Sequence, residues 1–169
     1  MDLHPEPLRM YGQPSEADAL DWAWVDGQLR EAGTYWAVAR GAGLPHPRPV
    51  WGVWSDHHLN LSIGSLVLAT ALTRDRAVTV HLDSGTDVVI VEGEATGPIT
   101  DAELIDSYAD KYGQPYDVET YGPLTRIVPT TVIAWRAAGW AGRDGFRQAG
   151  RWSRRATAPQ PDPPSSPST

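Results

Sequence analysis

The sequence predicts a mainly β protein of the α+β class, built as an antiparallel β-barrel of six or seven strands with two or three flanking helices. Short runs of β-forming residues recur along the chain, turn sequences separate most of them, and few helical segments lie between them. Frequent hairpins with few intervening helices favour an antiparallel barrel over a parallel sheet of βαβ units.

Runs rich in β-branched and aromatic residues, bounded by turn sequences, place the strands. Residues 41–45 (GAGLP) and 83–86 (DSGT) have the composition of tight turns. Residues 87–95 are dominated by valine, isoleucine and glutamate, with the apolar residues at the start. The predicted strands cover about 34–39, 46–54, 59–63, 77–82, 87–95, 125–136 and 146–152.

Apolar spacing and capping residues predict the helices. In the first helix, Leu20, Trp24 and Leu29 recur at helical spacing, and Gly33 follows as a stop signal. The predicted helices are 16–32 with Ser15 as N-cap, 64–74 with Ser65 as N-cap, and 101–112 with Thr100 as N-cap.

The length of 169 residues fits one domain with a substantial core, which we expect over residues 15–154. Residues 1–14 contain three prolines and no periodicity, so they predict an irregular N-terminal lead. Residues 155–169 are rich in proline, serine and threonine, and such a composition cannot bury enough apolar surface to offset the entropy of ordering. We therefore expect a disordered tail.

Composition excludes several classes of protein. The chain has no cysteine, which removes disulfides, thiolate nucleophiles, thiolate zinc sites and iron–sulfur clusters. The net charge of −7 disfavours a nucleic-acid-binding surface. No apolar stretch approaches the roughly 20 residues that cross a bilayer, and residues 1–13 lack a signal-peptide pattern. We expect a cytoplasmic protein with no membrane partner. His57 and His58 are adjacent in a predicted turn and make no convincing metal pair.

Several phrases occur in one order along the chain: ARGAGLPHPRPVWGVW (39–54), LNLSIGS (59–65), LTRDRAVTVHL (72–82), DVVIVEGEA (87–95) and GRW (150–152). Together they resemble the pyridoxamine 5′-phosphate oxidase-like superfamily, whose members use flavin mononucleotide (FMN) or the deazaflavin coenzyme F-420. The resemblance covers about residues 21–152. It implies a split β-barrel, a homodimer and a cofactor held in the dimer crevice.

A flavin nucleotide presents a phosphate and a flat apolar ring, so its site needs cation donors and an apolar or aromatic wall. The resemblance aligns Arg48 with the arginine that contacts this phosphate; a surface ion pair is the alternative role. Pro49 and Val50 continue that strand and are assigned to the same site. Alternation places Val50 on the face of Arg48 and Trp51 on the other face. Trp51 and His46 are substrate-side candidates, with structural roles as the alternative.

Ser62, Gly64 and Ser65 lie where a strand opens into a helix, and hydroxyls beside free N–H groups at a helix N-terminus suit a phosphate. An ordinary N-cap at Ser65 is compatible with this role. Flavin-binding members usually carry a Ser-Arg-Lys-like run in this helix. Here no basic residue occurs over 63–72, and Arg74 is the first one. Charge-assisted contacts contribute about 1.5–3 kcal/mol each, so this departure leaves the choice of cofactor open.

Lys111 and Arg151 complete the candidate site through the resemblance. A Lys-Tyr pair often ends the corresponding helix, so Lys111 is assigned to the cofactor, although a lysine there also complements the helix C-terminus. Arg151, from the closing GRW, is expected to reach the cofactor or substrate of a partner subunit.

The resemblance implies an oxidoreductase in which reduced FMN or F-420 passes a hydride equivalent to a small organic substrate. The redox chemistry belongs to such a cofactor, so no nucleophile–base triad is required, and the sequence has no recognisable elbow motif for one. The first alternative is a non-catalytic barrel that binds a flavin, a haem or another planar ligand. The second alternative is a dimeric structural or interaction protein without a ligand.

Overall fold

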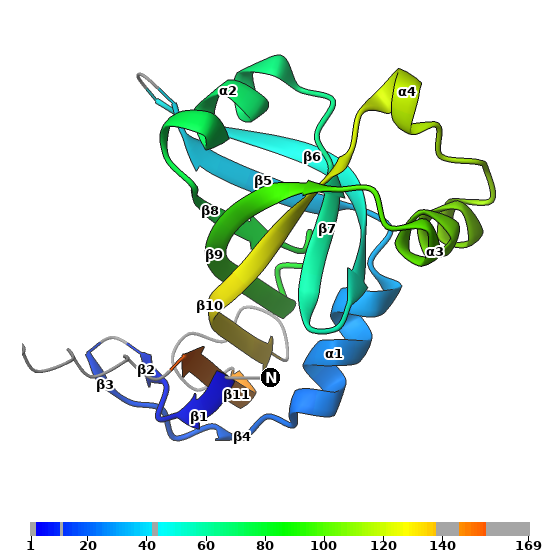
Figure 1. The fold of residues 1–169 in the computed structure, drawn as a ribbon. Coiled ribbons are helices and arrows are strands. Elements are labelled where there is room, and N and C mark those ends of the chain that lie inside the picture. The colour runs from blue at the N-terminus through cyan, green and yellow to red at the C-terminus, as the bar shows by residue number, and fades with distance from the viewer. Residues whose placement is uncertain (1–2, 11, 42–43, 138–145, 155–169) are drawn as a thin grey trace, which may run out of the picture.

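The computed structural model describes residues 3–10, 12–41, 44–137 and 146–154. Its centre is a closed antiparallel barrel in the strand order β10-β7-β6-β5-β8-β9, in which β9 pairs back to β10 (Figure 1). The six strands are β5 (Tyr35–Arg40), β6 (Pro45–Ser55), β7 (His58–Ser62), β8 (Ala77–His81), β9 (Asp87–Ile99) and β10 (Leu124–Ala137). This arrangement confirms the predicted mainly β, antiparallel barrel.

A smaller group of strands extends the sheet beyond the barrel. The strand β11 (Phe146–Arg154) pairs with β10, and β1 (Leu3–Glu6) pairs with β11. The two-residue strand β4 (Asp18–Ala19) pairs with β11 in parallel. Residues 3–6, expected to be irregular, are thus a strand, since pairing with β1 covers an edge of β11 that would otherwise be open. A short hairpin of β2 (Arg9–Met10) and β3 (Gln13–Pro14) stands apart from this sheet.

The strand β10 belongs to both groups because it changes partner halfway. Residues 125–127 pair with β7, residues 131–137 pair with β11, and the opposite edge of β10 pairs with β9 along most of its length. Pro129 lies at the change and has no N–H to donate to a neighbouring strand. Gly93 of β9 pairs with Pro129, and a Cβ at Gly93 would come within 2.5 Å of the Val128 carbonyl oxygen. A proline and a glycine therefore permit the branch point.

Helices cover the barrel at several places (Figure 1). In that view α2 lies at the top of the barrel, α3 and α4 lie beside it, and α1 lies below α3. The helix α2 begins directly after Ser65, whose Oγ accepts from Leu68 N at 3.3 Å, as predicted. The short helix α4 was not expected. The bounds are α1 (Trp22–Glu31), α2 (Leu66–Arg74), α3 (Ala102–Tyr112) and α4 (Val118–Tyr121).

Two predicted N-caps were wrong. The first helix begins after Asp21, whose carboxylate accepts from Ala23 N at 3.0 Å, rather than after Ser15. Pairing with β11 holds residues 18–19 in an extended conformation, so the helix cannot begin before them. The third helix is capped by Asp101, whose carboxylate accepts from Leu104 N, rather than by Thr100. In both cases a carboxylate nearer to the helix takes the first free N–H groups.

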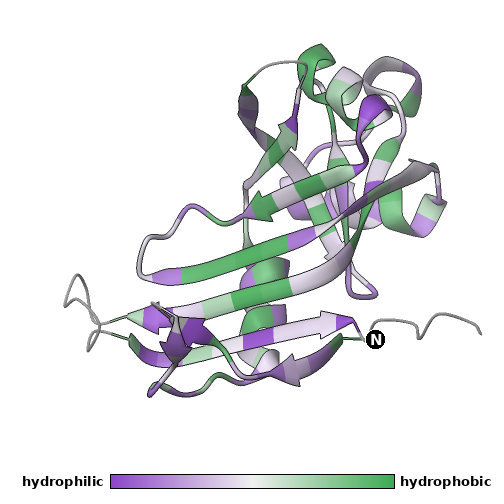
Figure 2. Ribbon diagram, turned by 90° about the vertical axis from the view of Figure 1, so that its left-hand side faces the viewer, coloured by the Kyte–Doolittle hydropathy of each residue, from purple (hydrophilic) through white to green (hydrophobic). Residues whose placement is uncertain are grey.

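The main core fills the barrel and extends under α1. Hydrophobic segments run along the long strands in Figure 2. Val25 and Leu29 of α1 are fully buried against this core. Trp22 meets Trp152 of β11 edge to face at a ring distance of 5.2 Å. A second cluster, under α3, joins Val53, Leu104, Tyr108, Tyr116 and Leu124. Among the described residues, no helix has the length and apolar character needed to cross a bilayer. The predicted tail, 155–169, lies outside the described residues.

Candidate functional site

A cavity of about 380 Å³ lies at the open end of β6 and β7, where the start of α2 faces the α3–α4 connection. Seven of the ten residues predicted for the site line it, three of them from β7 and the start of α2 and four from β6. The lining residues are Arg48, Pro49, Val50, Trp51, Ser62, Gly64, Ser65, Tyr108, Gln114, Pro115, Tyr116 and Tyr121. We refer to this space as the β6–α2 cavity.

The strand β6 supplies one wall. Val50 is buried in the barrel core, and the adjacent Trp51 has 48 % of its surface exposed, as strand alternation predicts. The Trp51 ring stacks on the Tyr112 ring with centroids 5.2 Å apart and an interplanar angle of 15°. The wall therefore offers a flat aromatic surface that is already packed on its rear side.

Polar groups that suit an anion gather near the start of α2. The guanidinium of Arg48 donates a hydrogen bond from Nη1 to the Pro47 carbonyl oxygen at 2.8 Å. Among the described residues, no carboxylate lies within 4 Å of this guanidinium. Ser62 and Ser65 bring hydroxyl groups to the same cavity. The first N–H groups of α2 face its N-terminal end, where the helix dipole favours negative charge. In the part of the chain that the structure describes, Arg48 is the one cationic side chain that lines the cavity.

Three tyrosines form the opposite wall. The Tyr108 ring lies 4.6 Å from the Tyr116 ring, which in turn lies 5.6 Å from Tyr121. The Tyr116 hydroxyl donates to the Gly122 carbonyl at 3.0 Å and lies 3.1 Å from Ser62 Oγ. Burial raises the pKa of Tyr108 to about 12, so its phenol stays neutral at physiological pH. This wall is aromatic, uncharged and fixed to β7 by a hydroxyl contact.

The tyrosine wall was not predicted from the sequence. The sequence carries only part of the signal. Tyr108 and Tyr112 are four residues apart and so share one face of α3, but Tyr108 lines the cavity whereas Tyr112 packs behind Trp51. Gly113 ends α3 in the left-handed conformation, with a φ of 68°, and turns the chain back so that Tyr116 meets Tyr108.

Lys111 does not line the cavity. Its Nζ donates to the Tyr35 hydroxyl and to the Gly52 carbonyl, at 3.0 Å in each case. The ammonium also lies 4.9 Å from the centroid of the Tyr35 ring. Burial lowers the pKa of Lys111 to about 8. The lysine therefore stands behind the β6 wall rather than in front of it.

The other two predicted residues lie elsewhere in the single chain. His46 lines a neighbouring groove with Leu66, Val67 and Arg74 of α2. Arg151 lines a separate cavity of about 560 Å³, where its Nε contacts Glu6 Oε2 at 3.2 Å. Among the described residues, no group of three or more histidine and carboxylate side chains could hold a metal ion.

Neither a protein-family model nor a curated protein sequence matches the chain. Several solved structures match the chain. A conserved hypothetical protein from Mycobacterium tuberculosis aligns with a TM-score of 0.60 and 21 % identity, over 73 % of this chain and 90 % of its own. The chain adopts the split-barrel fold. This confirms the architecture that the sequence resemblance implied.

Two further split barrels have names that mention a cofactor. An FAD-binding protein from Mesorhizobium loti aligns with a TM-score of 0.52 and 15 % identity, over 79 % of this chain and 96 % of its own. An F-420 reductase aligns with a TM-score of 0.50 and 16 % identity, over 62 % of this chain and 93 % of its own. The pyridoxinephosphate oxidase family is also represented among the matching split barrels. At identities this low, the structural likeness shows a common fold alone.

Proposed function

We propose that this split barrel binds a flavin-type cofactor, FMN or F-420, in the β6–α2 cavity and acts as an oxidoreductase on a small organic substrate. The observation that carries the proposal is the pairing of two unlike surfaces in one cavity. Arg48 and the start of α2 form an end suited to an anion, and Trp51 faces a wall of tyrosines suited to a flat ring. A flavin or deazaflavin nucleotide has both parts.

The residues present fit such a cofactor. Arg48 would contact the phosphate, with Ser62 and Ser65 as hydroxyl partners beside it. Trp51, Tyr108 and Tyr116 would hold the ring, orient it and exclude water from its face. A bound flavin or deazaflavin supplies the hydride transfer, so the chain itself contributes position and electrostatics.

One observation favours a second candidate, a non-catalytic barrel that binds a flavin, a haem or another planar ligand. The first turn of α2 carries Leu66 and Val67, which are 83 % and 47 % exposed, where basic residues would strengthen a phosphate site. A single guanidinium makes one strong charge-assisted contact of about 1.5–3 kcal/mol. A ligand bound mainly through its ring would suit a cavity that offers several aromatic side chains but few charge-assisted contacts.

The functional unit in this proposal is a homodimer. Five large hydrophobic side chains are exposed among the described residues, and four of them border the β6–α2 cavity or the groove beside it. The four are Trp51 and Tyr121 at the cavity and Leu66 and Val67 at the groove, and the fifth exposed residue is Leu44. A second copy would cover this surface and narrow the mouth of the cavity. Sedimentation equilibrium tests the dimer, and a monomer at micromolar concentration counts against it.

A ligand screen with two readouts tests the proposed function. The purified chain is examined for absorbance and for the mass of any small molecule that denaturation releases. It is then titrated with FMN, riboflavin, F-420 and haem while the melting temperature is followed. Binding at 100 times the dissociation constant stabilises by about 2.7 kcal/mol, an easily measured shift. Hydride transfer from a reduced cofactor to acceptor dyes separates the enzyme from the inert binder. If none of the four ligands raises the melting temperature, both candidates fail.

A further inference from the structure

The backbone of β6 loses its neighbour on one side just where it lines the cavity. The strand β5 begins at Tyr35, which pairs with Val50, so residues of β6 after Val50 have no partner in β5. On its other edge β6 continues to pair with β7, with Gly52 opposite Leu61. The N–H and carbonyl of Gly52 therefore depend on groups outside the sheet.

The last turn of α3 supplies those groups. Gly52 N donates to the Tyr112 hydroxyl at 3.0 Å, and Lys111 Nζ donates to the Gly52 carbonyl at 3.0 Å. The Tyr112 hydroxyl is 3.1 Å from the Gly33 carbonyl, to which it can donate its own proton. Two consecutive side chains thus take the place of a missing strand beside Gly52.

Lys111 has an unusual environment for a lysine. It is partly buried, and no carboxylate lies within 4 Å of Nζ among the described residues. Instead Nζ lies over the rings of Tyr35 and Tyr112, at 4.9 and 5.5 Å from their centroids. The Tyr35 hydroxyl, which accepts from Lys111, donates onward to the Leu29 carbonyl at 2.6 Å. Keeping an ammonium here without a counter-ion is costly, and the oxygens and aromatic faces compensate for it.

The same turn also holds the ring of Trp51. Tyr112 stacks on Trp51, the residue before Gly52, at a centroid distance of 5.2 Å. On the other side β6 is paired with β7, Trp51 opposite Ser62, so closely that a Cβ at Gly52 would lie 2.5 Å from the Asn60 carbonyl oxygen. The position of Trp51 is therefore fixed by β7 on one side of the strand and by Lys111 and Tyr112 on the other.

We propose that Lys111 is a positioning residue that acts with Tyr112 to hold Gly52 and so sets the Trp51 wall for a planar ligand. The expected effect on ligand binding rests on the proposed function, whereas the expected effect on the strand rests on the Gly52 contacts alone. This role differs from the expectation that Lys111 contacts the cofactor directly. Removing Lys111 should loosen residues 51–53 first and weaken the ligand through them.

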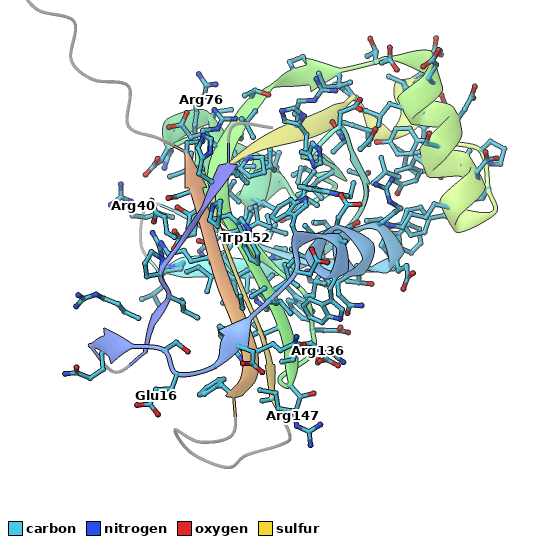
Figure 3. All side chains as sticks on the ribbon, turned by 90° about the horizontal axis from the view of Figure 1, so that it is seen from below. Glu16, Arg40, Arg76, Arg136, Arg147 and Trp152 are labelled. Atoms are coloured by element: carbon cyan, nitrogen blue, oxygen red, sulfur yellow. The ribbon has the colours of Figure 1, made fainter. Side chains whose placement is uncertain are left out.

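Two variants and one control test the inference. Lys111→Met removes the charge and the donors but keeps the length of the side chain, and Tyr112→Phe removes only the hydroxyl beside Gly52. Arg147→Met removes an exposed cation on β11, at the edge of the molecule away from α3 (Figure 3). Amide hydrogen exchange of Gly52, followed by ¹⁵N NMR, reports on the strand without any ligand. Fluorescence titration with FMN or F-420 reports on the cavity.

We expect Gly52 to exchange at least tenfold faster in Lys111→Met and Tyr112→Phe, and the ligand to bind at least fivefold more weakly. Lys111→Arg should recover part of both effects, whereas Arg147→Met should match the wild type. Unchanged Gly52 exchange in both variants overturns the inference, whether or not a ligand binds. Faster exchange with unchanged affinity also overturns it, since Lys111 would then be only structural. A wild-type chain that binds no ligand overturns the proposed function, while the exchange result still decides whether Lys111 holds the strand.

Discussion

The hydroxyl groups of Ser62 and Tyr116 lie 3.1 Å apart, and this contact joins the end of β7 to the connection between α3 and α4. The Tyr116 hydroxyl also donates to the Gly122 carbonyl, so a single phenol links three segments that line or support the β6–α2 cavity. A network of this kind should couple the stability of the connection to the shape of the cavity.

Replacing Tyr116 with phenylalanine should destabilise the chain by about 1 kcal/mol, because two contacts of one buried hydroxyl are lost. Urea denaturation measures the change. In a double-mutant cycle with Ser62→Ala, the two losses should be less than additive, because each substitution removes the same contact. Tyr121→Phe provides the control, since this tyrosine is 60 % exposed. Full additivity would show that the Ser62–Tyr116 contact contributes no coupling.

Replacing Arg48 with methionine should weaken FMN binding by about ten- to a hundredfold, because one charge-assisted contact of about 1.5–3 kcal/mol is removed. Riboflavin, which lacks the phosphate, should bind the variant and the wild type equally. Stability should hardly change, since the described side-chain bond of Arg48 is to the adjacent Pro47 carbonyl. Isothermal titration with both ligands checks the prediction. Arg74→Met, at the other end of α2, serves as the matched control. An equal loss for FMN and riboflavin would remove Arg48 from the phosphate site.

Replacing Leu66 with arginine should tighten FMN binding, because a second guanidinium would then stand at the first turn of α2. The leucine is 83 % exposed, so the substitution should not disturb the core. A new partly solvated contact of about 1 kcal/mol corresponds to a gain of roughly fivefold in affinity. Leu44→Arg, at a residue that is 79 % exposed, controls for the added charge. The same gain in both variants would point to nonspecific attraction rather than to a phosphate site.

The stability of the chain should rise with pH through the titration of Lys111. Burial lowers the pKa of Lys111 to about 8 in the folded chain, whereas an unfolded lysine titrates near ~10.4. Between these values the unfolded state binds more protons, so the free energy of unfolding increases as the pH rises. Because the side chain is only half-buried, solvent screening limits the effect to the order of 1 kcal/mol.

Urea denaturation at pH 7 and pH 9.5 measures this effect. The gain between the two pH values should be present in the wild type and absent in Lys111→Met. Comparison of the two proteins cancels the groups that they share, including the N-terminal amine. Burial raises the pKa of Tyr35 above its usual value, which lowers stability only when unfolded tyrosines begin to ionise near ~10. Equal pH dependence in both proteins would show that Lys111 does not carry the effect.

Much of the barrel could be predicted because its signals are local. Strands such as 77–81 and 58–62 combine β-forming residues with turns on either side, and these signals agree with the sheet. The strands β1 and β4 could not be predicted in the same way. They are four and two residues long, and each is extended because β11, from the other end of the sequence, pairs with it.

In the candidate site, too, the residues with local signals could be predicted, and those placed by distant parts of the sequence could not. Arg48, Ser62 and Ser65 follow from a resemblance in sequence order, and the structure brings all three to one cavity. The tyrosine wall depends on the path of the chain after Gly113, where a glycine in the left-handed conformation reverses direction. No spacing rule connects Tyr116 with Ser62, because 54 residues separate them along the chain. The role of Lys111 beside Gly52 likewise depends on where β5 begins.

The pairing of Leu3 with Arg154 has a consequence for how the molecule assembles. This ladder closes a loop that spans nearly the whole described chain, and contacts of such long sequence separation form slowly. During synthesis β1 emerges from the ribosome about 140 residues before β11 and has no partner in the sheet until β11 follows. Nascent chains stalled before residue 146 should therefore expose their N-terminal segment to proteases, and circular permutants that join the two strands by a short linker should fold faster.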